Sequence, residues 1–142
     1  MSIEALVNLE KAGQLKEETP EQSQIDAMIR SARTRLADIE AKGLSEEGKF
    51  SLAYGAAHSL AVAALRLHGY RPANRYIAFQ CLQHTVGLEK SSWRLLSQCH
   101  DIRNRAEYEG TLNITPKLLG ELIETTRELL GIVESLERNR QT

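Results

Sequence analysis

The segment from Ser45 to Leu67 limits the fold of this chain more than any other. Its apolar residues recur at helical spacing, and further alanines widen that surface; they are Phe50, Ala53, Tyr54, Ala56, Ala57, Leu60, Ala61, Ala63, Ala64 and Leu67. Small side chains on several sides allow neighbouring helices to approach closely. Because Ser45 is a good N-cap and is followed by Glu46 and Glu47, we predict a central helix that begins here.

The same periodicity predicts helices along the rest of the chain. We expect a short helix within residues 1–15 that ends near Gly13, a second from Thr19-Pro20 to Gly43, a short one capped by Asn74, one from Glu89 to Tyr108 that ends at Gly110, and a last one from Thr115-Pro116. Residues 16–19 are interpreted as a connector and residues 69–73 as a turn. No segment alternates apolar and polar residues, so we expect no strand.

These helices predict one all-α domain over residues 1–142. The chain has 142 residues, 42% of them hydrophobic, which is enough for one sizeable core. Amphipathic helices joined by short loops pack as an up-and-down bundle. We therefore expect a four-helix bundle over about residues 20–138, with the first helix and the Asn74 helix as short additions.

Composition argues against a membrane protein and against a disulfide-rich one. No apolar stretch approaches the roughly 20 residues of a membrane span, and the N-terminus lacks the basic and apolar regions of a secretory signal. The two cysteines, Cys81 and Cys99, are too few for a disulfide scaffold. We expect free thiols, a cytoplasmic location, no contact with a membrane and no cofactor.

Cysteine and histidine pairs raise the question of a zinc site. Cys81 and His84 have i, i+3 spacing, but Cys99 and His100 are neighbours, whose side chains point about 100° apart on a helix. Such neighbours do not easily share one metal ion. We therefore predict buried thiols and no metal site. We interpret His58, which lies among Ala and Leu, as a hydrogen-bonded core histidine.

Charge is spread unevenly along the chain. Residues 48–88 carry four basic residues and no acid, a net charge of +4, although the whole chain has −1. One interpretation is a buried helix pair with few charges of any kind; the other is a basic rim that attracts phosphates. Bases and aromatic residues also alternate near the predicted turn, which suits either RNA contact or arginines that reach solvent: His68, Tyr70, Arg71, Arg75 and Tyr76.

The predicted helix over Glu89–Tyr108 carries a polar band beside its apolar stripe. On a helical wheel the stripe consists of Leu95, Cys99, Ile102 and Ala106. The band beside it consists of His100, Arg103, Asn104, Glu107 and Tyr108. Five groups able to form hydrogen bonds within two turns are more than a solvated face needs. The alternative is structural, with Arg103 and Glu107 as an i, i+4 ion pair and the other groups bonded to a loop backbone.

The run Arg103-Asn104-Arg105-Ala106-Glu107-Tyr108 resembles the signature of HEPN domains, which are small helical bundles. That signature is an Arg, often followed by Asn, then a short spacer and a His, near the end of a late helix. The layout is similar as well, with an Ala-rich central helix, the motif helix, a short loop and a long final helix over about residues 20–138. The motif is short, and its place in the chain adds specificity.

This resemblance implies a function that involves RNA or a nucleotide. Many HEPN proteins resemble one another as metal-independent endoribonucleases, often toxins of toxin–antitoxin modules, and act as homodimers whose motif helices face each other. By that resemblance Arg103 would bind the scissile phosphate and stabilise the charge that develops on it. Asn104, Arg105 and Glu107 would line the binding site, and the family's His would move protons at the RNA 2′-OH.

The chain departs from the signature because Tyr108 stands where the His is expected. A phenol is a poor base at neutral pH, whereas His100, one turn before Arg103 on the same face, can supply an imidazole. Some HEPN proteins with a similar motif partner a nucleotidyltransferase-like antitoxin, and in some of these pairs a Tyr close to the motif looks like an acceptor for nucleotidylation; the resemblance implies this role for Tyr108 as an alternative. Three hypotheses stay open: a ribonuclease toxin that uses Arg103, Tyr108 and His100, a non-catalytic binding module, and a purely structural protein.

Overall fold

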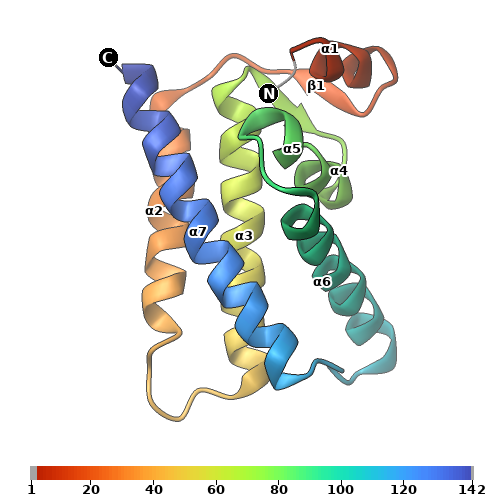
Figure 1. Ribbon diagram of the computed structural model, residues 1–142, viewed down its shortest axis with the longest axis vertical. Coiled ribbons are helices and arrows are strands. Elements are labelled where there is room, and N and C mark those ends of the chain that lie inside the picture. The colour runs from red at the N-terminus through yellow and green to blue at the C-terminus, as the bar shows by residue number, and fades with distance from the viewer. Residues whose placement is uncertain (1–2, 142) are drawn as a thin grey trace.

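The computed structural model describes residues 3–141, and helices form most of it (Figure 1). The helices are α1 (Ile3–Lys11), α2 (Gln22–Asp38), α3 (Glu46–Leu67), α4 (Arg75–Gln80), α5 (Leu82–Thr85), α6 (Lys90–Glu109) and α7 (Pro116–Gln141). Two short strands are β1 (Leu15–Glu17) and β2 (Tyr70–Pro72). The predicted all-α character is confirmed. The first two residues of the predicted N-terminal helix lie outside the described residues.

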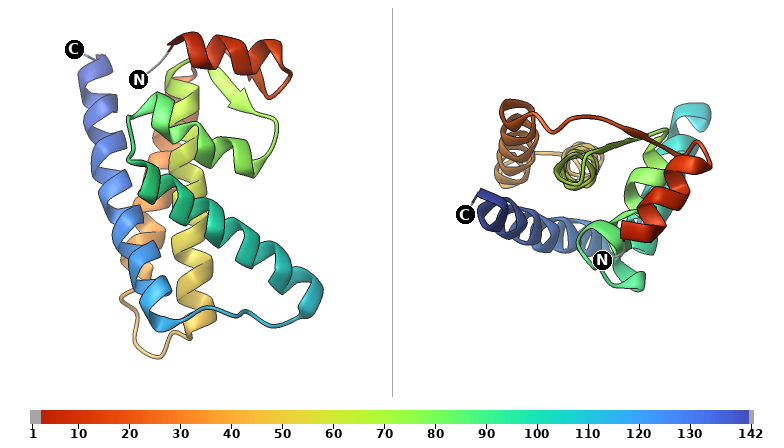
Figure 2. Two further views of the ribbon diagram at one scale, coloured as in Figure 1. Left: turned by 45° about the vertical axis from the view of Figure 1, so that its right-hand side comes forward. Right: turned by 90° about the horizontal axis from the view of Figure 1, so that it is seen from above.

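Helix α3 is central, as predicted. It packs mainly against α2 and α7 and also contacts β2, α4, α5 and α6, and Figure 2 shows it between α2 and the shorter helices. Six of its alanines are completely buried: Ala53, Ala56, Ala57, Ala61, Ala63 and Ala64. The hydroxyl oxygen of Ser45 accepts a hydrogen bond from the Gly48 N–H at 3.0 Å, so the predicted cap is confirmed.

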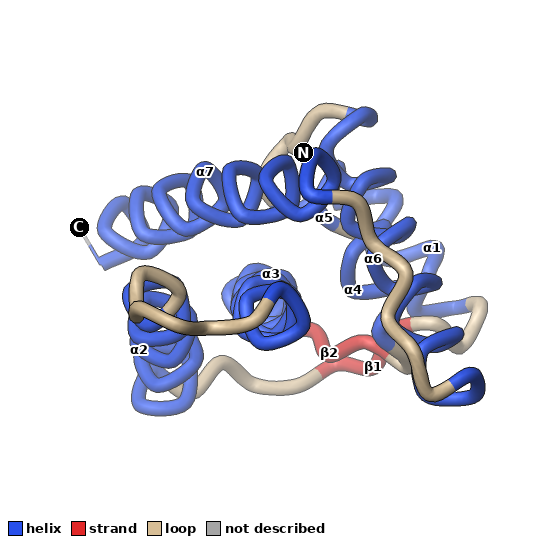
Figure 3. The backbone as a smooth tube through the Cα atoms, turned by 90° about the horizontal axis from the view of Figure 1, so that it is seen from below, coloured by secondary structure: helices blue, strands red, loops and turns tan. Residues whose placement is uncertain are grey.

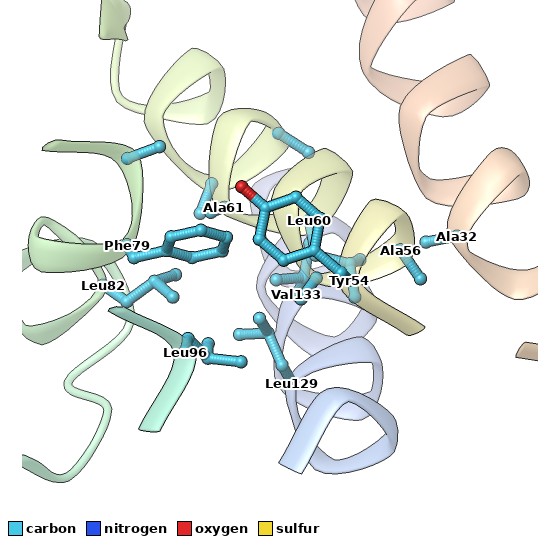
Figure 4. Packing of buried hydrophobic residues seen from close by; sticks show 14 of the residues in the cluster. Ala32, Tyr54, Ala56, Leu60, Ala61, Phe79, Leu82, Leu96, Leu129 and Val133 are labelled. Atoms are coloured by element: carbon cyan, nitrogen blue, oxygen red, sulfur yellow. The ribbon is translucent and has the colours of Figure 1, made fainter. Parts of the chain in front are cut away.

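The core extends from α2 through α3 to α4 and α6. In Figure 4, Leu129 and Val133 of α7 lie on one side of α3, and Phe79 of α4 lies beside Tyr54 on another. Each fully buried side chain of this size contributes roughly 1.5–3 kcal/mol relative to an exposed one. Phe79 is therefore as much a core residue as the leucines of α7, although it belongs to a helix of only six residues.

Helix α6 does not follow the other long helices over its whole length. It packs mainly against α4 and contacts α3 and α7 less, and its C-terminal end lies apart from α3 in Figures 1 and 3. In contrast, α2, α3 and α7 lie side by side. The described residues thus form a three-helix core from which the motif end of α6 projects, and the regular four-helix bundle stays a prediction.

Two short strands show that the prediction of a strand-free chain was wrong. Strand β1 pairs antiparallel with β2, with Leu15 opposite Pro72 and Glu17 opposite Tyr70. The predicted connector and the predicted turn both contribute to this pair. Strands of three residues are too short to show a period-two pattern in the sequence. Because Leu15 is 1% exposed, the pair fastens the N-terminal segment to the end of α3.

The same pairing explains why α2 begins at Gln22 and not at the predicted Thr19-Pro20. The Glu18 N–H donates to the carbonyl oxygen of Gly69 at 2.8 Å. This bond continues the strand pairing beyond β1 and keeps the segment extended, so the helix starts later.

Helix ends depend on caps, and most predicted caps are confirmed. Asn74 caps α4, Thr115 caps α7, and Gly110 ends α6 with a φ of 75°. Helix α2 instead ends at Asp38, before the predicted Gly43. Beyond it the N–H groups of Glu40 and Ala41 donate to the carbonyl oxygens of Ala37 and Asp38, three residues back, which tightens the last turn and ends the α-helical pattern.

Helix α3 is the one described helix that is long and apolar enough to cross a membrane, by length and composition alone. Of the residues in its most apolar window, 61% are buried inside the protein. Core helices of soluble proteins share that combination, so this is weak evidence for a membrane span.

Candidate functional site

Helix α6 turns part of its polar band toward the protein interior. Its buried residues are Leu96, Ser97 and Cys99. Three members of the predicted apolar stripe are only half-buried: Leu95, Ile102 and Ala106. The buried face is therefore rotated from the predicted arc toward Leu96, and this rotation brings His100 and Arg103 against Tyr54 of α3.

His100 is held by a hydrogen bond at each ring nitrogen. Its Nδ1 lies 2.9 Å from the hydroxyl oxygen of Tyr54, and its Nε2 lies 3.2 Å from the amide nitrogen Nδ2 of Asn104. Because an amide nitrogen only donates, Nε2 accepts, and Nδ1 carries the proton that it donates to Tyr54. The hydroxyl proton of Tyr54 is then available to a further acceptor.

Two guanidinium groups lie over the ring of Tyr54. The Cζ of Arg103 is 5.4 Å from the ring centroid and that of Arg75 is 5.7 Å from it, within the range of a cation–π interaction. Arg103 forms an ion pair with Glu107 at 3.0 Å, and Glu107 is 58% exposed. Within the described residues Arg75 forms no ion pair. Two positive charges therefore lie close to the buried ring of Tyr54.

We name these side chains the Arg103 cluster: Tyr54, Arg75, His100, Arg103, Asn104 and Glu107. Phe79 supports the cluster from the core. Its ring centroid lies 5.7 Å from that of Tyr54 and 6.3 Å from that of His100. The cluster therefore joins α3, α4 and α6 and rests on a fully buried aromatic ring.

Burial keeps the phenol and the imidazole of the cluster neutral. Burial raises the pKa of Tyr54, and a side-chain interaction with Arg75 and the charges of Arg75 and Arg103 oppose this increase. Burial lowers the pKa of His100; Asp101 opposes that shift, and Arg75 and Arg103 reinforce it. At physiological pH the cluster therefore holds a protonated phenol and an uncharged imidazole, and its positive charge resides on the arginines.

A pocket of about 320 Å³ lies beside the cluster, between α2, α3 and α4. We name it the Arg35 pocket, and its lining residues are Met28, Ser31, Arg35, Gly55, His58, Ser59, Val62 and Arg75. These residues include two arginines and no acid. Arg75 belongs to both the pocket and the cluster, so the two form one continuous basic surface.

His58 is not the hydrogen-bonded core histidine that the sequence predicts. It is half-buried, lines the Arg35 pocket, and packs edge-on against Phe79 with the ring centroids 6.1 Å apart. No hydrogen bond joins its ring to another described residue. Its pKa is lowered to about 4, mainly by burial and also by the charges of Arg75, His100, Arg103 and Arg35. His58 therefore lies where the positive charges of the pocket and the cluster converge.

The structure brings four of the six predicted site residues together and leaves two apart. His100, Arg103, Asn104 and Glu107 belong to the cluster. Arg105 instead lines a small pocket of about 50 Å³ with Glu109 and loop residues, because two positions along a helix turn the side chain by about 200°. Tyr108 is 91% exposed in the last turn of α6.

Three contributors were not predicted as site residues: Arg35, Tyr54 and Arg75. Tyr54 matches the apolar core stripe of its helix, so the periodicity did not indicate that its hydroxyl group belongs to a polar cluster. The excess of basic residues over residues 48–88 was the signal for Arg75. Arg75 begins α4 directly after the predicted turn and lies over Tyr54, whereas His68 Nε2 lies 2.9 Å from the Thr85 carbonyl oxygen.

Both cysteines are free and buried. Burial raises the pKa of Cys81 to about 11 and that of Cys99 to about 12. Both thiols are therefore protonated and poorly nucleophilic at neutral pH. Over residues 3–141, no three His, Cys, Asp or Glu side chains gather closely enough to hold a metal ion.

Comparison with known proteins finds no family model that matches the chain, and no curated protein or solved structure that is significantly similar to it.

Proposed function

We propose that this chain is an RNA- or nucleotide-associated protein in which the Arg103 cluster binds a phosphate group. The observation that carries the proposal is the placement of Arg75 and Arg103 over the same buried phenol. Like charges held near each other raise the free energy of the folded state. A phosphate between them would lower it and would accept strong charge-assisted hydrogen bonds. The free proton of Tyr54 supplies a further donor.

The same cluster supports the HEPN-like interpretation of the sequence. The Arg and the Asn of the motif both belong to it, and the Asn fixes the tautomer of the neighbouring imidazole. In this proposal the chain is a cytoplasmic HEPN-like helical bundle, and Arg103 is its principal phosphate ligand.

Binding is favoured over cleavage by the state of His100. A general base needs a lone pair within reach of the proton that it removes. The Nε2 lone pair of His100 is already engaged by Asn104, and Nδ1 carries the proton that Tyr54 accepts. Tyr108, at the position of the family's His, is exposed in the last turn. A non-catalytic binding module is therefore our first proposal, and a metal-independent endoribonuclease toxin is the second.

The exposed C-terminal end of α6 suggests how the protein would engage partners. A homodimer through α6 would face two copies of the cluster toward each other, and a nucleotidyltransferase-like antitoxin would find Tyr108 accessible as an acceptor. We expect light scattering at micromolar concentration to show a species heavier than the 15.9 kDa monomer. A monomer at every concentration tested would refute the dimer.

The proposed function is tested by Arg103→Ala, with Arg94→Ala as its control. Both arginines lie on α6, but Arg94 is exposed and contacts Trp93. Loss of a charge-assisted phosphate contact should weaken binding of a 12-nucleotide single-stranded RNA or of ADP about ten- to a hundredfold. Loss of the exposed ion pair with Glu107 should cost less than about 1 kcal/mol of stability. Fluorescence anisotropy and thermal melting measure the two effects.

The control variant should bind like the parent. Incubation with total RNA in the same experiment separates the two candidate functions, because intact RNA favours the binding module and cleaved RNA favours the toxin. If Arg103→Ala bound both probes like the parent and melted several degrees lower, Arg103 would be structural and the proposed function would be wrong.

A further inference from the structure

Arg35 of α2 packs against α3 at Gly55, where no side chain separates its guanidinium group from the helix backbone. A Cβ added to Gly55 would collide with the Nη1 atom of Arg35. The guanidinium group therefore occupies space that any other residue at position 55 would fill. Within the described part of the chain, this group forms neither an ion pair nor a hydrogen bond, although it lines the pocket.

The neighbouring Arg33 shows that this arrangement is not general for α2. Arg33 forms an ion pair with Glu134 of α7. Two arginines on one helix, two residues apart, thus have opposite surroundings, because one faces an acid and the other faces a basic pocket. Arg35 is exposed to solvent, and it lines the same pocket as Arg75, where an anion from solution would meet two positive charges and no acid.

The remaining groups of the Arg35 pocket suit a phosphate. Ser31 and His58 line it with polar atoms that no described residue engages by a hydrogen bond, and both can donate to an acceptor. Ser59 already donates its hydroxyl proton to the Met28 carbonyl oxygen at 2.9 Å. The volume of about 320 Å³ lies at the lower end of the range for ligand pockets, roughly 300–1,000 Å³.

We propose that the Arg35 pocket is a second phosphate-binding site, in which Arg35 and Arg75 bind the phosphate and Ser31 and His58 donate further hydrogen bonds. Gly55 is the positioning residue, since its missing side chain lets Arg35 reach the pocket. Arg75 borders both sites, so consecutive phosphates of one RNA strand or of one nucleotide can occupy the pocket and the Arg103 cluster together. This last step rests on the proposed function, whereas the pocket itself does not.

Two substitutions test the pocket by different routes. Arg35→Ala removes the cation, and Gly55→Ala displaces it without removing a charge. Each should weaken binding of inorganic phosphate, ADP and a 12-nucleotide single-stranded RNA, by about tenfold or more for Arg35→Ala. Gly55 lies inside a helix and lacks a positive φ, so alanine there is otherwise favourable and the melting temperature should not fall. Arg33→Ala is the matched control and should bind all three probes like the parent.

A second readout comes from His58, which lines the Arg35 pocket. Because the charges of the Arg103 cluster also act on this histidine, it is measured in Arg103→Ala, where the rise in pKa should persist, as well as in the parent. An anion in the pocket favours the charged imidazolium, so saturating inorganic phosphate should raise the pKa of His58 in an NMR titration. The same rise should be absent in Arg35→Ala. Binding of RNA but not ADP would identify a nucleic acid strand as the source of the phosphate, and binding of ADP would identify a nucleotide.

The outcomes separate this proposal from the proposed function. Parent-like binding by both Arg35→Ala and Gly55→Ala, an unchanged pKa of His58, or no binding of any probe at millimolar concentration would each overturn the Arg35 pocket. If Arg103→Ala alone lost binding, the cluster would stand without the pocket. If Arg35→Ala alone lost it, the pocket would stand and the proposed function of the cluster would fail.

Discussion

Arginines between α2 and α7 and arginines around Tyr54 are placed in opposite ways. Arg33 of α2 pairs with Glu134 of α7, and Arg127 of α7 pairs with Glu40, which lies just after α2 ends at Asp38. Around Tyr54, Arg103 pairs only with an acid on its own helix. The cross-helix ion pairs are largely exposed and contribute little stability, whereas among the described residues the arginines around Tyr54 form no ion pair with an acid of another helix.

The two groups of arginines also differ in their aromatic neighbours. Tyr54 and Phe79 lie beneath the arginines, and the ring of Tyr54 interacts with both guanidinium groups. No aromatic ring contacts Arg33 or Arg127 among the described residues. Aromatic rings stabilise nearby cations without neutralising them, so Arg75 and Arg103 keep their positive charge beside the ring of Tyr54.

The largest effect that we expect comes from Phe79→Ala. Because Phe79 is completely buried, its truncation to alanine should cost about 3–5 kcal/mol of stability. Leu129→Ala, in the core between α3 and α7, should cost about 2–5 kcal/mol. Urea denaturation measures both. Folded Phe79→Ala protein should also bind RNA more weakly, because Tyr54 and His100 lose their support, whereas folded Leu129→Ala should not. Equal binding by the two variants would remove the distinction between the regions.

A smaller loss is expected for Tyr54→Phe. Removal of the hydroxyl leaves the Nδ1–H of His100 without its acceptor, which should cost about 1–3 kcal/mol. Tyr76→Phe is the control, since Tyr76 is 44% exposed and its substitution should be nearly neutral. Thermal melting of both variants checks this. A Tyr54→Phe protein as stable as its parent would show that the hydrogen bond is not structural.

Acidic pH should destabilise the protein around the Arg103 cluster and the Arg35 pocket, because His100 and His58 become protonated there. The pKa of His58 is about 4 in the folded chain, and that of His100 is also lowered, whereas an unfolded chain has values near about 6.5. The unfolded state therefore binds more protons in this window, so stability is complete above about pH 6.5 and falls as the pH drops toward 4. The groups that face His58 are Arg35, Arg75, Arg103 and His100.

His58→Gln should reduce this pH dependence, because it removes the histidine whose pKa is lowered most. Melting temperatures of parent and variant between pH 7 and pH 4.5 measure the difference. Parallel curves for the two proteins would show that burial of His58 does not contribute to acid sensitivity.

Local signals in the sequence were enough for most of the fold. The alanines of α3, its Ser45 cap, the Asn74 and Thr115 caps and Gly110 act within a few residues, and each was predicted. The strand pair and the late start of α2 depend instead on a hydrogen bond between Glu18 and Gly69, far apart in the chain. No periodicity reports such a bond, so these features could not be predicted.

The site was predicted in part for the same reason. His100, Arg103 and Asn104 lie on one helix, so their proximity follows from helical spacing. Arg35 and Arg75 reach the same surface from two other helices, and their position depends on how closely α2 and α4 approach α3. Gly55 leaves space for the guanidinium group of Arg35, and Phe79 of α4 packs against Tyr54 of α3; both roles become visible only in three dimensions.

The smallest expected effect concerns the ion pair between Arg33 and Glu134. Its measurement sharpens the comparison of the two groups of arginines. A double-mutant cycle of Arg33→Ala and Glu134→Gln should give a coupling energy of roughly 0.2–1 kcal/mol, because Arg33 is largely exposed and its ion pair is screened by solvent. Neither change should alter phosphate binding. Arg35→Ala should have no comparable stabilising partner to lose, and relief of repulsion from Arg75 should leave its stability unchanged or higher. If Arg35→Ala were the more destabilising variant, the unpaired arginine would be structural and the contrast between the two groups would fail.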